Sequence, residues 1–154
     1  MGAWANSSND ADPTSLGLQQ AASVLFDAPL TKWQERNMRT VKNSAEFADA
    51  VEDGRNLLAA MYEHTQAELK GAGIEEVILY RGVVGEHLKG LVEDGIYVLD
   101  ENALESWSLS PKMANQFADP ISRHRRLPAV VLQVIVPRER ILCTPKTGFG
   151  CLGE

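Results

Sequence analysis

The chain changes character at GAGIEEVILY, residues 71–80. Before this stretch, apolar residues recur at helical spacing, as Leu58, Met61 and Tyr62 do, and Ser44 stands where a helix N-cap is expected. The glycines of the quoted stretch break the helix, and its second half has the β-branched and aromatic density of a central strand. Helices first and strands afterwards predict an α+β fold rather than alternating βαβ units.

Further elements follow from the pattern beyond this stretch. AVVLQVIV, residues 129–136, is the strongest strand signal in the chain, and it is closed by a proline. Three shorter strands are predicted at residues 96–98, 105–110 and 141–143. Between the strands, the sequence predicts a short helix over residues 114–118.

The short helix has signals at both of its ends. Ser110 is the expected N-cap, with Pro111 in the first turn, which is an arrangement that helices favour. Asp119-Pro120 is expected to stop the helix. The polar and basic stretch 121–128 is therefore predicted to be a loop.

Length and composition predict one domain. The chain has 154 residues, 44% of them hydrophobic and 23% charged, which is ordinary for a globular protein with a full core. Residues 1–15 are expected to be a flexible lead-in. Residues 16–154 are expected to be a single domain, helical over 16–70 and β-rich over 71–154.

Charge and targeting signals narrow the class of protein. A net charge of −6 and a pI near 5.1 argue against a general nucleic-acid binder, but they do not exclude a nucleotide ligand. No apolar run is long enough to span a membrane, and the first residues lack the pattern of a signal peptide. We therefore expect a soluble protein that is intracellular or is delivered into a target cell.

Common catalytic and metal-binding signatures are missing from the sequence. Cys143 and Cys151 form no Cys-x-x-Cys motif, so a zinc site is not expected, although a disulfide between them stays open. There is no Gly-x-Gly-x-x-Gly, no Walker lysine and no Gly-x-Ser-x-Gly. Any nucleotide would have to be held in another way.

One arginine and two serines are the candidate site residues that spacing alone suggests. Arg81 follows the apolar run 77–80 and is expected to close a strand, which suits a phosphate or carboxylate ligand. Ser108 and Ser110 place two hydroxyls on one side of a predicted strand. Each has an ordinary alternative: a surface ion pair of Arg81 with a carboxylate such as Glu75, an ordinary strand hydroxyl for Ser108, and helix capping by Ser110.

Four pieces stand in a particular order along the second half of the chain. They are an arginine after a strand, a Ser-x-Ser segment, a helix ending in Phe-Ala and a Gly-rich approach to a glutamate, namely Arg81, Ser108-Leu109-Ser110, Phe117-Ala118 and Glu154. This order resembles the toxin-type mono-ADP-ribosyltransferases, a family related to the enzymatic domains of clostridial binary toxins. The resemblance covers residues 74–154, about half of the chain.

The resemblance implies a fold, a reaction and partners. The implied fold is an N-terminal helical segment followed by a mixed, β-sandwich-like ADP-ribosyltransferase core. The implied reaction cleaves the nicotinamide glycosidic bond of NAD and transfers ADP-ribose to a protein acceptor, with arginine as one candidate acceptor and without a metal. The alternative is a catalytically dead NAD-binding or protein-interaction module derived from that fold.

The resemblance also assigns roles to particular residues. Arg81 would contact the NAD phosphates, and the backbone of Gly82 would meet the nicotinamide carboxamide. Ser108 and Ser110 would shape the nicotinamide pocket and orient the catalytic glutamate. The aromatic stacking partner is not identified, although Phe117 is a candidate, as is Trp107. The dense basic stretch 123–126 would face the pyrophosphate, with its cations supplied by Arg123 and Arg126 among others.

The glutamate can be aligned with the family in two registers, and the first is favoured because Gly153-Glu154 after a Gly-aromatic turn matches the family's entry to its motif. If Glu154 is the first glutamate of the family's Glu-x-Glu motif, the catalytic glutamate and the last strand lie outside this sequence, and the chain is expected to be a fragment without turnover. If Glu154 is the catalytic residue, Leu152 takes the acceptor-directed position, and transfer to arginine becomes doubtful.

Overall fold

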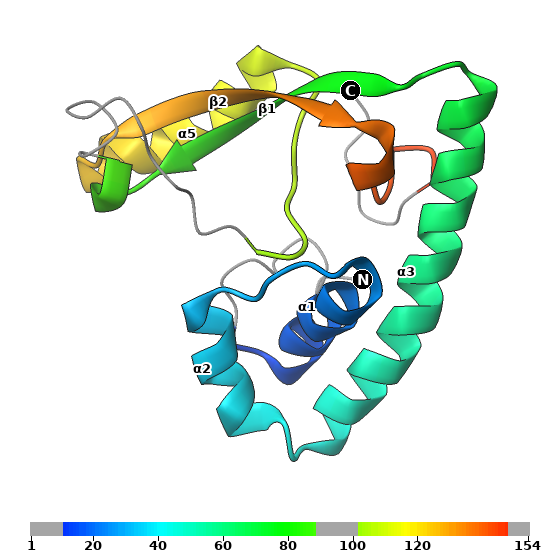
Figure 1. Ribbon diagram of the computed structural model, residues 1–154. Helices are drawn as coiled ribbons and strands as arrows, with labels where there is room; N and C mark the ends of the chain where they lie inside the picture. The colour runs from blue at the N-terminus through cyan, green and yellow to red at the C-terminus, as the bar shows by residue number, and fades with distance from the viewer. Residues whose placement is uncertain (1–10, 89–101, 148–154) are drawn as a thin grey trace. The chain divides into compact units, whose positions relative to one another are not determined.

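The structure is a computed structural model, in which residues 11–88 and 102–147 are described (Figure 1). These residues combine helices with an antiparallel pair of strands, which confirms the predicted α+β class. They form two compact units, each built from separate stretches of chain. The first unit holds residues 11–74, 102–105 and 139–147, and the second holds residues 75–88 and 106–138.

The first unit is built on three helices: α1 (Pro13–Phe26), α2 (Lys32–Val41) and α3 (Ala45–Gly71). α1 begins inside the stretch that the sequence assigned to the lead-in, because Asp12 caps it: the backbone N–H of Ser15 donates to the Asp12 carboxylate at 2.9 Å.

The other two helices of this unit are capped by hydroxyls. Thr31 and Gln34 form a reciprocal capping box at the start of α2. The Ser44 hydroxyl accepts from the N–H of Phe47 at 3.2 Å, which confirms the cap predicted for α3.

Small residues let α1 and α3 approach closely. A Cβ added at Gly17 would lie 2.6 Å from the Cβ of Ala50, and one added at Gly54 would lie 3.2 Å from the Cβ of Ala21. Next to this seam, Leu58 is completely buried in a cluster of apolar side chains. The close approach of the two helix backbones therefore depends on glycine and alanine at these positions.

The segment 102–105 is attached to α1 through a buried amide. The Gln19 side chain donates to the carbonyl of Leu104 at 3.3 Å and accepts from its N–H at 3.0 Å. Both backbone groups of Leu104 are satisfied in this way, and its side chain joins the cluster around Leu58.

The second unit contains a two-stranded antiparallel sheet of β1 (Glu76–Val84) and β2 (Ala129–Pro137). On the other edge of β1, Tyr80 and Ser108 form an isolated bridge. Of the predicted strand 105–110, this bridge is the part that is observed. The predicted strand 96–98 lies outside the described residues.

α5 (Pro111–Arg125) is much longer than the sequence suggested. The prediction that Asp119-Pro120 ends the helix is wrong, and most of the predicted loop 121–128 is helical. Proline at position 120 removes one helical N–H donor. α5 packs on both strands of the sheet, and beyond the proline Arg123 forms an exposed ion pair with Asp119 at 2.8 Å.

Candidate functional site

Arg81 lies inside β1 rather than at its end. The expectation that the strand closes at this residue is wrong, because residues 129–131 of β2 pair with residues 82–84 of β1. The Arg81 Nη1 donates to the carbonyl of Ser106 at 2.9 Å, and the guanidinium carbon lies 5.9 Å from the ring centroid of Trp107. The cation is thus held by a carbonyl and an aromatic ring of one neighbouring segment.

Apolar residues surround Arg81 on its face of the sheet. Its cross-strand partner is Leu132, and the pairs on either side are Leu79 with Val134 and Val83 with Val130. All of these side chains are half-buried. Arg81 is thus flanked by apolar side chains on its face of the sheet, while the hydrogen bond of its guanidinium is exposed.

The alternative ion pair of Arg81 with Glu75 is not the one observed. The Glu75 carboxylate accepts instead from Arg138 Nη1 at 3.1 Å, and the Arg138 N–H donates to the Glu75 carbonyl at 2.8 Å. This pair closes the end of the β1–β2 ladder.

Gly82 has a packing role that the sequence did not indicate. A Cβ at this position would overlap the carbonyl oxygen of Ala114 and would lie 2.9 Å from the Cβ of Ala118. Gly82 therefore lets α5 lie directly on β1, on the face opposite to Arg81. The contact of its backbone with nicotinamide stays a prediction.

Ser108 is fixed next to Arg81 by its backbone and its side chain. Its N–H and carbonyl both bond to Tyr80 at 2.8 Å. Ser108 is buried, with 8% of the residue exposed. Its hydroxyl accepts from the N–H of Ser110 at 2.9 Å and donates to the Ser110 carbonyl at 3.1 Å. The Ser108 hydroxyl thus shapes the turn that leads from the sheet into α5.

Ser110 caps α5, as predicted. Its hydroxyl accepts from the N–H of Met113 at 3.3 Å, and its carbonyl accepts from the N–H of Ala114 at 3.1 Å. The capping alternative for Ser110 is confirmed, and a role at the nicotinamide pocket stays a prediction.

The remaining predicted site residues lie farther along the second unit. Phe117 is 58% exposed on α5. Arg123 pairs with Asp119 in the last turns of α5, and Arg126 follows the helix with a φ of 55°. From Ala114, which touches Gly82, to Arg123 the helix rises by about 13 Å. The structure thus groups Arg81, Gly82, Ser108 and Ser110, but not the two later arginines.

Glu154 lies outside the described residues. Trp107, which the sequence offered only as a candidate stacking residue, proves to be the aromatic neighbour of Arg81. Ser106 was missed, because a backbone carbonyl acceptor leaves no signal in side-chain chemistry.

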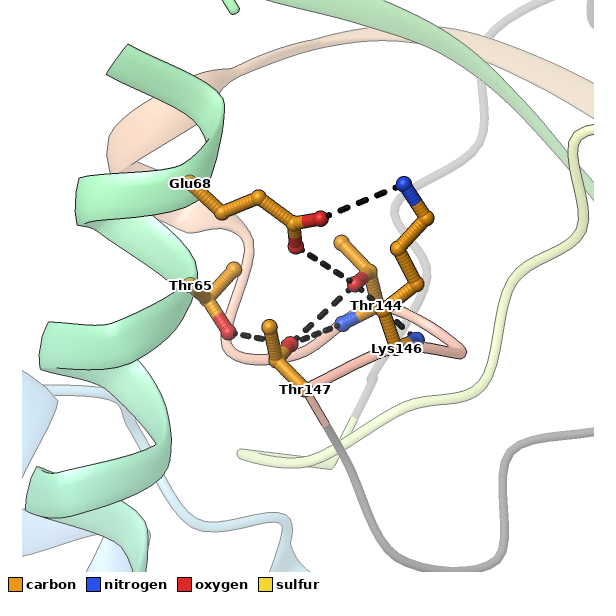
Figure 2. A network of polar contacts seen from close by, with 5 residues as sticks. All are labelled: Thr65, Glu68, Thr144, Lys146 and Thr147. Carbon is orange, nitrogen blue, oxygen red and sulfur yellow. Dashed lines mark hydrogen bonds and ion pairs between the residues drawn. The ribbon is translucent and has the colours of Figure 1, made fainter. Parts of the chain in front are cut away.

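A second polar cluster lies in the first unit, where α3 meets the segment after β2 (Figure 2). The hydroxyls of Thr65 and Thr147 are 2.6 Å apart, and the Glu68 carboxylate contacts the Thr144 hydroxyl and the Lys146 amine, each at 3.4 Å. The prediction of a strand at residues 141–143 is wrong, because these residues are held by side chains of α3. The cluster anchors residues 144–147 to α3.

Two kinds of feature are absent from residues 11–88 and 102–147. Among them, no group of three or more histidine, cysteine, aspartate or glutamate side chains is placed to hold a metal ion. None of the described helices combines the length and the apolar character that crossing a membrane requires.

Comparisons of the chain with protein-family models, with curated proteins and with solved structures found no match.

The Ser110 cap leads to a first prediction. Ser110→Ala is expected to lower the free energy of unfolding by about 1 kcal/mol, because the N–H of Met113 loses its acceptor. Urea denaturation followed by circular dichroism measures this. Ser106→Ala is the matched control, since the Ser106 side chain is exposed and the observed contact with Arg81 uses its carbonyl, which the substitution keeps. Equal stability of the two variants would show that the cap contributes nothing.

Proposed function

We propose that this chain is a mono-ADP-ribosyltransferase-like domain that binds NAD, cleaves its nicotinamide glycosidic bond and transfers ADP-ribose to a protein acceptor. The positions of three residues support the proposal most directly. Arg81 lies on a half-buried sheet face beside Trp107, and Ser108 pairs with the same strand one residue away. An arginine, an aromatic ring and a buried hydroxyl next to one another suit a ligand that carries both a phosphate and a flat ring.

Each residue has a chemical task in this proposal. The guanidinium of Arg81 binds a pyrophosphate oxygen pair through its forked N–H groups. The ring of Trp107 offers a flat surface for stacking. Ser108 keeps the turn before α5 in place, and in this proposal the turn forms one wall of the nicotinamide pocket.

The proposed reaction is a group transfer. The bond between the ribose C1′ and the nicotinamide nitrogen breaks, and nicotinamide leaves with the electron pair. A nucleophile of the acceptor forms the new bond to C1′ and loses its proton. The positive charge that develops on the ribose needs a nearby anion, and the proposal assigns this task to a glutamate, for which Glu154 is the candidate in this sequence.

The role of Arg81 is tested by calorimetric titration with NAD. Arg81→Ala is expected to weaken binding by roughly 1.5–3 kcal/mol, which corresponds to roughly 10- to 150-fold in Kd. The Kd of the Arg81→Lys variant should lie between those of the unchanged chain and the Arg81→Ala variant, because lysine keeps the positive charge but lacks the forked pair of N–H donors.

Arg55→Ala is the control for this titration, since Arg55 is an exposed arginine of α3 in the other unit. Its Kd should equal that of the unchanged chain. Equal affinities of the Arg81→Ala variant and the unchanged chain would remove Arg81 from the site. No NAD binding by the unchanged chain would reject the proposal.

Turnover is tested separately from binding. Release of nicotinamide from NAD is measured with and without an arginine analogue as acceptor. Release that Glu154→Gln abolishes would identify Glu154 as the catalytic carboxylate. NAD binding without release would favour the alternative of a binding module. Under the enzyme proposal, Ser108→Ala should lower kcat with little change in melting temperature. A loss of stability with normal kcat would make Ser108 purely structural.

A further inference from the structure

A groove of about 420 Å³ lies between α1 and α3, within the first unit. The buried residues Ala50 and Gly54 line it, together with the half-buried Leu18. Leu57, which is 41% exposed, also lines it.

The charge along this groove has a single sign. Glu46, Asp49 and Asp53 line it, and all three are exposed. Within the part of the chain that the structure describes, none of them forms an ion pair or a side-chain hydrogen bond. Their spacing of three and then four residues places them on one side of α3, over about 10 Å of its length. α1, on the opposite side, contains no charged residue.

The three carboxylates destabilise α3. Carboxylates three and four residues apart on a helix repel one another. Glu46 in the first turn is favoured by the helix dipole, but Asp53 lies too far along α3 to benefit. Where a sequence keeps a locally unfavourable pattern beside an apolar groove, a ligand that neutralises the charge is the physical explanation we favour.

We propose that the groove between α1 and α3 docks a basic amphipathic segment of a partner protein. Its lysine or arginine side chains pair with Glu46, Asp49 and Asp53, and an apolar side chain between them contacts Leu18 and Leu57. A helix presents such groups at intervals of three and four residues, which matches the spacing of the carboxylates. Anionic lipid or nucleic acid would be repelled by the same charges.

The proposal is tested with a defined probe, a fluorescently labelled synthetic peptide helix with leucines on one face and lysines on its flanks. Binding to the full chain is measured by anisotropy at low and at physiological salt. The double variant Asp49→Asn with Asp53→Asn is expected to bind the peptide about tenfold more weakly than the unchanged chain. Leu57→Ala should also weaken binding, and because Leu57 lies outside the buried core, with 41% of its surface exposed, the fold should tolerate this change.

The matched control changes the same charge elsewhere on the same helix. Glu52→Gln with Glu63→Gln removes two exposed carboxylates of α3 that do not line the groove. This variant should bind the peptide as the unchanged chain does. An equal loss in both double variants would mean non-specific attraction and would overturn the proposal. It would also be overturned if spermine bound as tightly as the peptide, or if replacing the peptide's leucines by serine left the affinity unchanged.

Discussion

Leu58→Ala is expected to lower the free energy of unfolding by about 2–5 kcal/mol. The Leu58 side chain is completely buried and packs against Ala21, Ala22 and Leu104. Two of these neighbours are alanines, which have no flexible atoms to move into the space. The cavity would therefore persist, and the cost should lie in the upper part of this range. Urea denaturation followed by far-ultraviolet circular dichroism measures it.

The adjacent residue is a precise control for this prediction. Leu57 belongs to the same helix and carries the same side chain, but it is 41% exposed. Leu57→Ala removes the same atoms and gains a little helix propensity, so its change in unfolding free energy should be small. Similar losses for the two variants would contradict the placement of Leu58 in the core of the first unit.

Gly82→Val is expected to destabilise the second unit by about 3 kcal/mol. Strand propensity alone would predict that Gly82→Val stabilises β1, because valine favours a strand and glycine weakens one. The tertiary contact decides the outcome, since any Cβ at this position overlaps the carbonyl oxygen of Ala114. A backbone atom within a helix cannot move aside alone, so α5 has to shift away from β1.

Gly71→Ala is the control for the glycine substitution. Gly71 ends α3, and a Cβ added there meets nothing within 4 Å. This variant should keep or slightly raise the melting temperature because alanine favours the helix. Tryptophan fluorescence should report the loss of the second unit in the Gly82→Val variant, because Trp107 lies there beside Arg81. A Gly82→Val variant as stable as the unchanged chain would show that α5 does not rest on Gly82.

Much of the fold was predictable because its signals are local. The helix-breaking glycines before β1, the β-branched residues of both strands and the hydroxyls at Ser44 and Ser110 each act within a few residues of themselves. The α+β order follows from these signals alone. The candidate site was predictable to the extent that Arg81, Ser108 and Ser110 are close together.

The errors in the prediction arose where packing overrules a local rule. Proline at position 120 favours a helix end, but α5 packs on both β1 and β2 and runs through to Arg125. The apolar triplet 141–143 resembles a strand, yet Gln66 of α3 donates to the carbonyl of Ile141 at 2.9 Å and takes the hydrogen bond that a strand would have supplied.

The sequence by itself determined the order of helices and strands, the caps and the residue types at the candidate site, because each depends on neighbours in the chain. Only the tertiary structure decided that Gly82 faces Ala114, that Gln19 holds Leu104, and that Trp107 lies beside Arg81. These contacts join residues that are distant in the chain, and the same side chains would be compatible with many other partners. The packing of whole helices and strands determines which of these partners meet, and a local sequence pattern carries no information about that packing.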